Sequence, residues 1–254
     1  MEITAIPDLP EFQVGENIAT HIESQVELTS DDVVLVASTI VSKVEGRQAR
    51  LADFPASERA EDISTRLENL TGETMEPEFV QAVLEESEEL LIEAPFLLAV
   101  TSFGHITVNA GIDRSNIPNS DLLMLPRKPS TSAKRIRAEL TVDADIVITD
   151  TSGRPFRHGQ RGVALGWAGL SPNRDWRGEH DRDGRELSAT VQCIVDELAG
   201  AANLVTGEGD GGTPIAVVRD WSFGDHAGDE NVFRDSAEDI VRQALRSWSF
   251  DDDS

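Results

Sequence analysis

The residues with the clearest potential for chemistry follow an apolar stretch near the middle of the chain. Residues 142–149 are mostly apolar and predict a buried strand, which is followed by Asp150, Thr151 and a turn rich in glycine and proline. A carboxylate and a hydroxyl are oxygen ligands for a hard cation such as Mg²⁺ or Mn²⁺. Arg154 and Arg157 come next, and arginines suit phosphate or carboxylate groups. The alternative interpretation is a strand that ends in a solvated turn.

Two other segments carry carboxylates in turns that contain glycine. Asp113 lies in one polar segment, and Glu208 and Asp210 lie in the glycine-rich segment 206–213. Three carboxylates and the Thr151 hydroxyl predict one or two divalent ions that keep open positions for substrate phosphates. Backbone N–H groups of the glycine-rich segment can also bind phosphate. This segment is not a Walker motif, because no lysine follows it and a strand comes next.

A hydroxyl-rich segment follows the apolar stretch 32–36, which predicts another buried strand. The segment contains Ser38, Thr39 and Lys43, in a chain with only three lysines. Hydroxyl and ammonium groups directly after a strand can bind phosphate oxygens. A turn with an exposed lysine is the competing interpretation.

The composition limits the possible partners. The 254 residues carry a formal net charge of −25, from 47 acidic and 22 basic residues that are spread along the chain. Such an acidic surface argues against nucleic acid and anionic membranes as partners. Acidic surfaces with little lysine resemble those of proteins from salt-rich cytoplasm, where a Debye length of about 3 Å at molar salt screens self-repulsion. We therefore expect a halophilic protein that loosens at low salt.

The sequence contains neither a signal peptide nor an apolar stretch long enough to span a bilayer, so we expect a cytoplasmic protein. Cys193 is the only cysteine and falls within a helical apolar pattern, which predicts a buried, inert thiol.

Strands and helices are both predicted along the chain, which indicates a mixed α/β class. Strands are expected at 3–6, 32–36, 96–101, 106–108, 122–125, 142–149, 159–169 and 214–218. Helices are expected at 15–28, 57–70, 76–91, 132–140, 185–203 and 236–248. Residues 171–186 are expected to form a long polar loop, and 37–43 a shorter one. We expect a single domain over 1–254 with a frayed acidic tail at 245–254.

Taken together, these segments resemble the coenzyme F420-0:L-glutamate ligase family. The matching stretches are LPEF at 9–12, VASTIVSKVEGR at 36–47, FVQAVLEESE at 79–88, VNAGIDRSN at 108–116, ITDTSGRPFRHGQRGVALGWAG at 148–169, DWRGEHDRDGREL at 175–187 and NLVTGEGDGGTPIAVVRD at 203–220. They occur in order over nearly the whole chain, and several are long and unusual.

The resemblance implies a homodimer with an unusual mixed-sheet fold, surrounded by helices, in which strand-end loops form a cleft. It implies GTP as co-substrate, divalent Mg²⁺ or Mn²⁺, and potassium as an additional cation. The implied reaction transfers the γ-phosphoryl group of GTP to a terminal carboxylate of coenzyme F420-0, a deazaflavin with a lactyl-phosphate side chain. L-Glutamate then attacks the acyl phosphate, and a second glutamate is added through a γ-linkage.

The resemblance also implies roles for individual residues. The metal-binding positions are Asp113, Asp150, Thr151 and Glu208. The GTP-binding positions are Leu9, Pro10, Glu11, Phe12, Ser38, Thr39, Lys43, Asn116, Thr206, Gly207 and Gly209. No catalytic residue is separable from these two sets. Arg154 and Arg157 are candidates for substrate binding on the grounds of charge and position alone.

Two other functions use the same residues. A metal-dependent nucleotide phosphohydrolase would release phosphate from GTP without an acceptor. A non-catalytic GTP-binding protein would bind the nucleotide without turnover, although the set of metal-type carboxylates argues against it.

Overall fold

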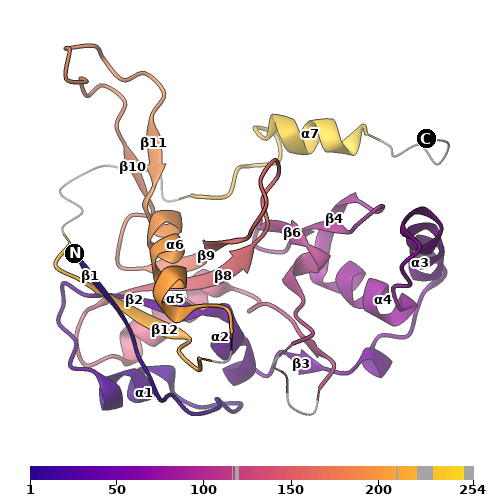
Figure 1. Ribbon diagram of the computed structural model, residues 1–254, viewed down its shortest axis with the longest axis horizontal. Helices are drawn as coiled ribbons and strands as arrows, with labels where there is room; N and C mark the ends of the chain where they lie inside the picture. Colours follow the sequence, from indigo (N-terminus) through magenta and orange to yellow (C-terminus); the bar gives the residue numbers. More distant parts are fainter. Residues whose placement is uncertain (116, 118–119, 210, 222–230, 249–254) are drawn as a thin grey trace. The chain divides into compact units, whose positions relative to one another are not determined.

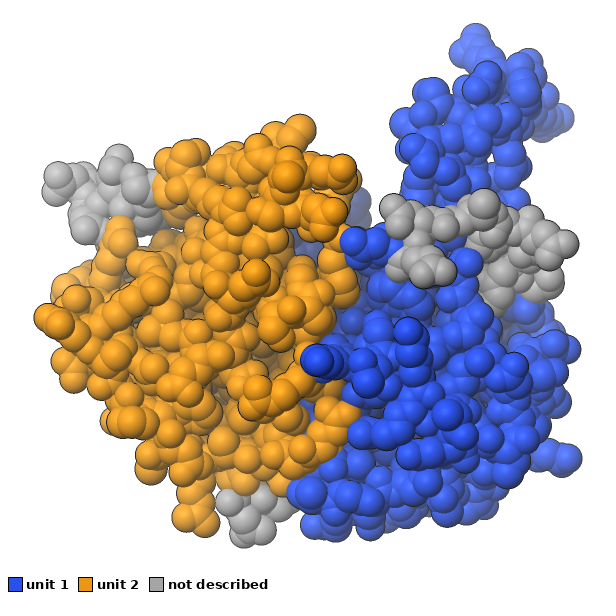
Figure 2. Space-filling view, turned by 180° about the vertical axis from the view of Figure 1, so that it is seen from behind, with its two compact units in different colours: residues 1–44, 128–232 blue, residues 45–127, 233–254 orange. Residues whose placement is uncertain are grey.

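The computed structural model describes residues 1–115, 117, 120–209, 211–221 and 231–248. The chain divides into two compact units (Figure 2). Unit 1 contains residues 1–44 and 128–232, and unit 2 contains residues 45–127 and 233–254. The single domain expected over 1–254 stays a prediction. The combination of helices with parallel and antiparallel strands confirms the mixed α/β class. Within the described ranges, no helix is long and apolar enough to cross a membrane.

Unit 1 is built around a mixed five-stranded sheet (Figure 1). In spatial order its strands are β1 (Glu2–Ala5), β12 (Ile215–Arg219), β2 (Val33–Ala37), β8 (Asp145–Ser152) and β9 (Arg161–Ala168). Only β2 and β8 run parallel, and the other neighbours are antiparallel. Since β2 and β8 are parallel, the residues that follow them meet at the same edge of the sheet.

Helix α6 (Ile194–Thr206) covers one face of this sheet and is drawn in front of it in Figure 1. Its apolar side packs on alternate residues of the central strands, including Val33, Leu35 and Val147. The helix approaches β9 so closely that a Cβ atom on Gly162 would lie 2.3 Å from the Ala199 carbonyl oxygen. Glycine at this position therefore allows α6 to contact the sheet backbone directly.

The described part of unit 1 contains three further helices. Helix α5 (Pro129–Glu139) packs on β8 and β9 and also contacts α1 (Ile18–Gln25), while α2 (Ser38–Val44) follows β2 without a loop. Asn17 caps α1 by accepting a hydrogen bond from the Thr20 N–H group. The hairpin of β10 (Asn173–Asp175) and β11 (Val191–Cys193) projects away from α6 (Figure 1).

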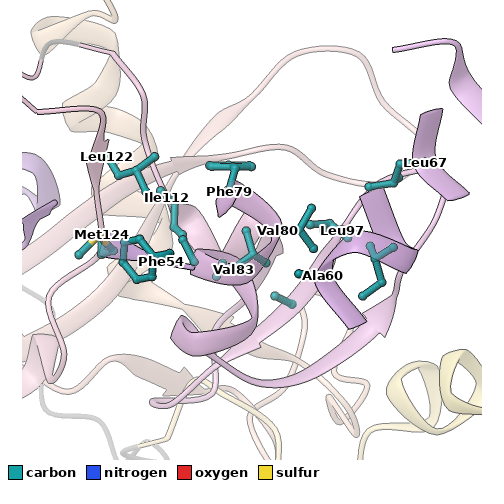
Figure 3. Close-up of a cluster of buried hydrophobic side chains, with 14 of the residues drawn as sticks. Phe54, Ala60, Leu67, Phe79, Val80, Val83, Leu97, Ile112, Leu122 and Met124 are labelled. Atoms are coloured by element: carbon teal, nitrogen blue, oxygen red, sulfur yellow. The ribbon is translucent and has the colours of Figure 1, made fainter. Parts of the chain in front are cut away.

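Unit 2 has a separate apolar core beneath its helices. The helices are α3 (Glu58–Thr71), α4 (Pro77–Glu86) and α7 (Ile240–Arg246), with short 3-10 turns η1 (Leu51–Asp53) and η2 (Asn109–Gly111). The sheets pair β3 (Gln48–Ala49) with β7 (Leu122–Leu123), and β4 (Ser87–Ile92) with β5 (Leu98–Thr101) and β6 (Ile106–Val108). Figure 3 shows Phe79, Val80 and Val83 of α4 among the buried side chains of this core.

Most predicted elements are confirmed, including the helix capped by Ser57 and the 96–108 hairpin. Four predictions are wrong. The helix expected at 76–91 ends at Glu86, because the next six residues pair with β5 as strand β4. The helix expected at 185–203 begins only at Ile194. Residues 191–193 form strand β11 instead, because they pair with β10, which lies within the loop expected at 171–186.

The other two corrections concern the candidate site. Residues 38–44 form helix α2, although the sequence analysis expected a loop at 37–43. The strand expected to stop at residue 149 continues as β8 through Ser152. Asp150 and Thr151 therefore lie within a strand, where pairing with Val163 and Gly162 of β9 holds their backbone.

Candidate functional site

The carboxyl ends of the two parallel strands bring Ser38 and Asp150 together. In the β2–β8 register, Ala37 lies opposite Thr149, so the next residue of each strand occupies the same edge of the sheet. The buried Ser38 hydroxyl donates a hydrogen bond to Asp150 Oδ1 over 3.1 Å. The predicted GTP-binding serine and the predicted metal-binding aspartate are therefore direct neighbours, although 112 positions separate them in the sequence.

A second polar group forms where the end of α6 reaches β8. The Thr151 hydroxyl donates to Glu208 Oε1 over 2.8 Å. The side-chain amide of Asn203, one turn before the end of α6, donates to the same Glu208 oxygen over 2.5 Å and lies 3.3 Å from the Thr151 hydroxyl oxygen. Thr151, Asn203 and Glu208 therefore form a connected hydrogen-bonded group, and two of its members were predicted metal ligands.

These two groups lie on opposite faces of β8. Side chains alternate along a strand, so consecutive Asp150 and Thr151 point in opposite directions. A β-bulge between Ile148 and Thr149, opposite the additional residue Leu165 of β9, lies immediately before this pair. Bulges change the direction of the side chains that follow them and are common beside active sites. Among the described residues, no three histidine, cysteine, aspartate or glutamate side chains are grouped so that they could hold a metal ion.

Oxygen donors of this kind nevertheless fit a hard divalent cation. Mg²⁺ is typically held by one or two protein carboxylates, with water and substrate phosphates as the remaining ligands. Asp150 supplies one carboxylate, and Glu208 with Thr151 supplies a carboxylate and a hydroxyl. Each of the two groups therefore suits an ion that depends on a phosphate substrate to complete its coordination.

Lys43 lies on α2 with its side chain almost fully buried. Its ammonium nitrogen is 2.6 Å from Glu11 Oε1, and the Glu11 side chain is 52% exposed. The pair joins two predicted GTP-binding segments and fixes the position of the Lys43 ammonium group. Leu9 and Pro10 precede Glu11, whereas the buried Phe12 ring packs edge-on against His21 at a centroid distance of 5.0 Å. Phe12 therefore anchors this segment to α1.

The segment after α6 is a compact loop. Gly207 ends the helix with a φ of 69°, a conformation that favours glycine, and its N–H group donates to the Asn203 carbonyl. The Thr213 hydroxyl donates to the Thr206 carbonyl over 3.0 Å and ties the two ends of the loop together. Glu208 and Gly209 lie between these ends, whereas Asp210 lies outside the described residues.

Two predicted ligands, Asp113 and Asn116, belong to unit 2. Asp113 exchanges backbone hydrogen bonds with Leu123, and its Oδ1 atom accepts from the N–H and hydroxyl groups of Ser115. Asn116 lies outside the described residues. The metal role of Asp113 and the GTP role of Asn116 therefore stay predictions.

Two further residues bear on the chemistry. Asn203 was not singled out in the sequence analysis, because an asparagine within a helix carries no motif of its own. The one feature that could have indicated a role for Asn203 is its position one helical turn before Gly207 and Glu208. Cys193 was predicted as a buried thiol within a helix, but it lies in β11 and is half-buried, because residues 191–193 pair with β10. Burial, followed by the charge of Asp196, raises the pKa of its thiol to about 11, so little of the reactive thiolate forms at neutral pH.

The chain is similar to proteins of one family over most of its length. Residues 8–220 match the family model described as F420-0:Gamma-glutamyl ligase. A protein from Halorubrum lacusprofundi named Coenzyme F420:L-glutamate ligase is 63% identical, and the match covers 99% of this chain and 100% of that protein. Proteins with the same name from Haloarcula marismortui and Archaeoglobus fulgidus are 61% and 43% identical, and both matches cover 98% of the relative and at least 97% of this chain.

Proposed function

Because the chain belongs to the F420-0:gamma-glutamyl ligase family, we propose that it joins L-glutamate to coenzyme F420-0 during coenzyme F420 biosynthesis. Full-length similarity to proteins named for this activity supports an acid–amino-acid ligase. The structural observation that carries the proposal is the pair of polar groups around β8, Ser38 with Asp150 and Thr151 with Glu208. They combine hydroxyl and carboxylate oxygens at the carboxyl end of a parallel strand pair, where α/β proteins commonly bind ligands.

The reaction requires activation of a carboxylate, because a carboxylate is a poor electrophile until one of its oxygens becomes a leaving group. In the proposed first step, a carboxylate oxygen of the coenzyme attacks the γ-phosphorus of GTP and GDP leaves. In the second step, the glutamate amine attacks the acyl carbon, phosphate departs and the nitrogen loses a proton. The product is an amide. A repeat of both steps activates the γ-carboxylate of the first glutamate, and the amine of a second glutamate then attacks it and releases phosphate.

The oxygen donors on β8 and in the 206–213 loop have defined roles in this proposal. Asp150 would hold one Mg²⁺ or Mn²⁺ ion, and Thr151 with Glu208 would hold another. Asp113 stays a metal ligand that is predicted from the sequence. A divalent ion supplies charge neutralisation of the triphosphate during phosphoryl transfer. Ser38 orients Asp150 through its hydroxyl, and Asn203 orients Glu208 through its amide. These fixed orientations reduce the reorganisation that substrate binding requires.

The proposal assigns nucleotide binding to three segments of unit 1, which lie before α1, on α2 and after α6. Lys43 and Thr39 of α2, with the segment from Leu9 to Phe12, would contact the nucleotide, as would Thr206, Gly207 and Gly209 after α6. The Glu11 carboxylate, which now pairs with Lys43, is the group that a nucleotide phosphate would replace beside the ammonium. The proposal also includes a homodimer, a potassium requirement and a cytoplasmic site of action.

Mass spectrometry of coenzyme F420-0 incubated with the protein, GTP, Mn²⁺ or Mg²⁺ and L-glutamate tests this function. We expect a mass increase of one glutamyl unit, then of a second, with one GDP formed for each addition. A coenzyme of unchanged mass would refute the ligase activity. Release of phosphate from GTP without coenzyme or glutamate would instead support the phosphohydrolase alternative, and nucleotide binding without any turnover would support a non-catalytic GTP-binding protein.

A further inference from the structure

The loop between β8 and β9 presents a phenylalanine directly to solvent. Phe156 has a relative accessibility of 105%, the highest of the large apolar side chains in the described residues. Its φ angle is 66°, in the left-handed region that is unfavourable for a bulky residue. Burial of the ring does not compensate for this backbone conformation. Residues that keep such a conformation without a packing benefit are concentrated at ligand-binding sites.

The same loop is cationic in a strongly acidic protein. Residues 151–174 contain no aspartate or glutamate, although the chain contains 47 acidic residues. Arg154 and Arg157 flank Phe156, and neither forms an ion pair or hydrogen bond with any described residue. Arg161, at the start of β9, is different because it pairs with Asp196 over 3.2 Å. Two guanidinium groups beside Phe156 therefore remain available to an anion.

We propose that Phe156, Arg154 and Arg157 form a binding site for a planar aromatic molecule that carries an anionic group. The Phe156 ring offers a flat apolar surface for stacking. The guanidinium groups offer paired N–H donors for phosphate or carboxylate oxygens. Pro155 restricts the backbone between Arg154 and Phe156, which lowers the entropy lost when the site binds its ligand.

Phe156 lies close in the sequence to Thr151, which belongs to the proposed metal-binding residues. Thr151 precedes Phe156 by five residues, and five extended residues span at most about 18 Å. One molecule could therefore contact the loop with an aromatic ring while a side chain extends towards β8. The inference rests on the proposed function, because it assigns the loop to the ring and phosphate of the acceptor coenzyme.

Equilibrium binding of coenzyme F420-0, followed by its fluorescence without GTP or glutamate, tests the role of Phe156. We expect Phe156→Ala and Phe156→Leu to raise the Kd for the coenzyme about tenfold. Phe156→Trp retains an aromatic surface and should bind with a Kd close to that of the original protein. The Kd for GTP and the unfolding midpoint should stay unchanged in all three variants. Phe96→Ala is the matched control, because Phe96 is also exposed but lies in unit 2.

The double variant Arg154→Gln with Arg157→Gln tests the anionic contact. We expect it to weaken binding of the phosphate-bearing coenzyme about tenfold and to leave binding of the same deazaflavin without phosphate unchanged. Arg59→Gln with Arg234→Gln changes the net charge equally at two exposed positions of unit 2 and should have no effect. Equal weakening in both double variants would overturn the proposal, since it would indicate a general charge effect.

The binding assay separates this inference from the proposed ligase activity. If the protein binds the coenzyme through Phe156 but adds no glutamate, the site is supported and the ligase activity is refuted. If glutamate is added normally and Phe156→Ala binds the coenzyme as tightly as the original protein, the site is refuted. A change in the sedimentation coefficient of Phe156→Ala with unchanged coenzyme binding would also overturn it, because the ring would then contact a second copy of the chain.

Discussion

The Thr151 hydroxyl lies 2.8 Å from Glu208 Oε1, across 57 positions of sequence. Thr151 belongs to a strand and Glu208 to the loop after α6, so their contact requires α6 to lie along β8 and β9. Gly162 permits that close approach. The packing of one helix on one strand therefore creates the second polar group of the candidate site.

Asp150→Asn should abolish glutamyl addition and leave the fold intact. The amide retains an oxygen for the Ser38 hydroxyl but loses the negative charge that a divalent cation requires. We expect the free energy of unfolding to change by less than about 1 kcal/mol, because Asp150 is only partly buried. Turnover is measured by mass spectrometry and stability by thermal unfolding. Near-normal activity would remove Asp150 from the proposed metal site.

Asn203→Ala should weaken activation by the divalent metal. The substitution removes the amide that orients Glu208 and Thr151, and loss of such supporting groups lowers metal affinity about 10- to 100-fold. A titration of activity against Mg²⁺ concentration should therefore show a higher half-saturation concentration, with activity partly restored at high Mg²⁺. Leu204→Ala is the matched control, because Leu204 is the next residue and its side chain is 86% exposed. An unchanged Mg²⁺ titration for Asn203→Ala would show that the amide has no such role.

Asp145→Asn should stabilise the protein at pH 7 but not at pH 4. Burial, partly offset by Arg137, raises the pKa of Asp145 from 3.8 to about 6. The folded state therefore binds more protons than the unfolded state between these values, and the free energy of unfolding falls as pH rises through this window. A neutral amide removes that penalty, which is worth about 3 kcal/mol at pH 7.

Thermal unfolding of the original protein and the Asp145→Asn variant, at constant salt, checks this pH dependence. The gain in midpoint at pH 7 should shrink steadily towards pH 4. The Asp31→Asn variant serves as control, because Asp31 is an exposed aspartate of unit 1 that is not among the groups that shift the pKa of Asp145. A gain that is independent of pH would contradict the proposed cause.

Glu89→Gln should weaken the contact between α7 and strand β4 of unit 2. Glu89 accepts hydrogen bonds from Arg242 and Arg246, and these contacts lower the pKa of Glu89 to about 2, with Arg246 as the largest cause. Its stabilising effect is therefore present at neutral pH and is lost as pH falls towards 2. Hydrogen exchange of residues 240–246 should accelerate in the variant at pH 7. Glu88→Gln, at the adjacent exposed position of β4, should leave that exchange unchanged.

The unfolding midpoint should rise steeply between dilute buffer and molar KCl. The net charge of −25 produces self-repulsion that falls as the Debye length shortens to about 3 Å. The high identity to proteins from Halorubrum and Haloarcula supports a halophilic adaptation of this kind. Thermal unfolding over a KCl series measures the effect. A midpoint that does not change with salt would refute the adaptation.

The sequence alone located many of the elements because their signals are local. Ser57 was predicted as a helix cap and accepts the Ala60 N–H group, and the apolar stretches that became β2, β8 and β12 were predicted as strands. The errors occurred where long-range pairing overrides local preference. Residues 87–92 have a helical pattern, but the backbone partners available in β5 make them a strand.

The sequence by itself determined the chemical inventory: a hydroxyl and carboxylate at 150–151, a glycine-rich loop, one lysine at 43 and an acidic surface. Composition and motifs are properties of the chain, so they needed no structure. Only the tertiary structure determined which groups touch. The parallel pairing of β2 and β8 places Ser38 on Asp150, and the approach of α6 adds Asn203 to Thr151 and Glu208. These contacts depend on strand register and helix packing between distant segments, which no local pattern encodes.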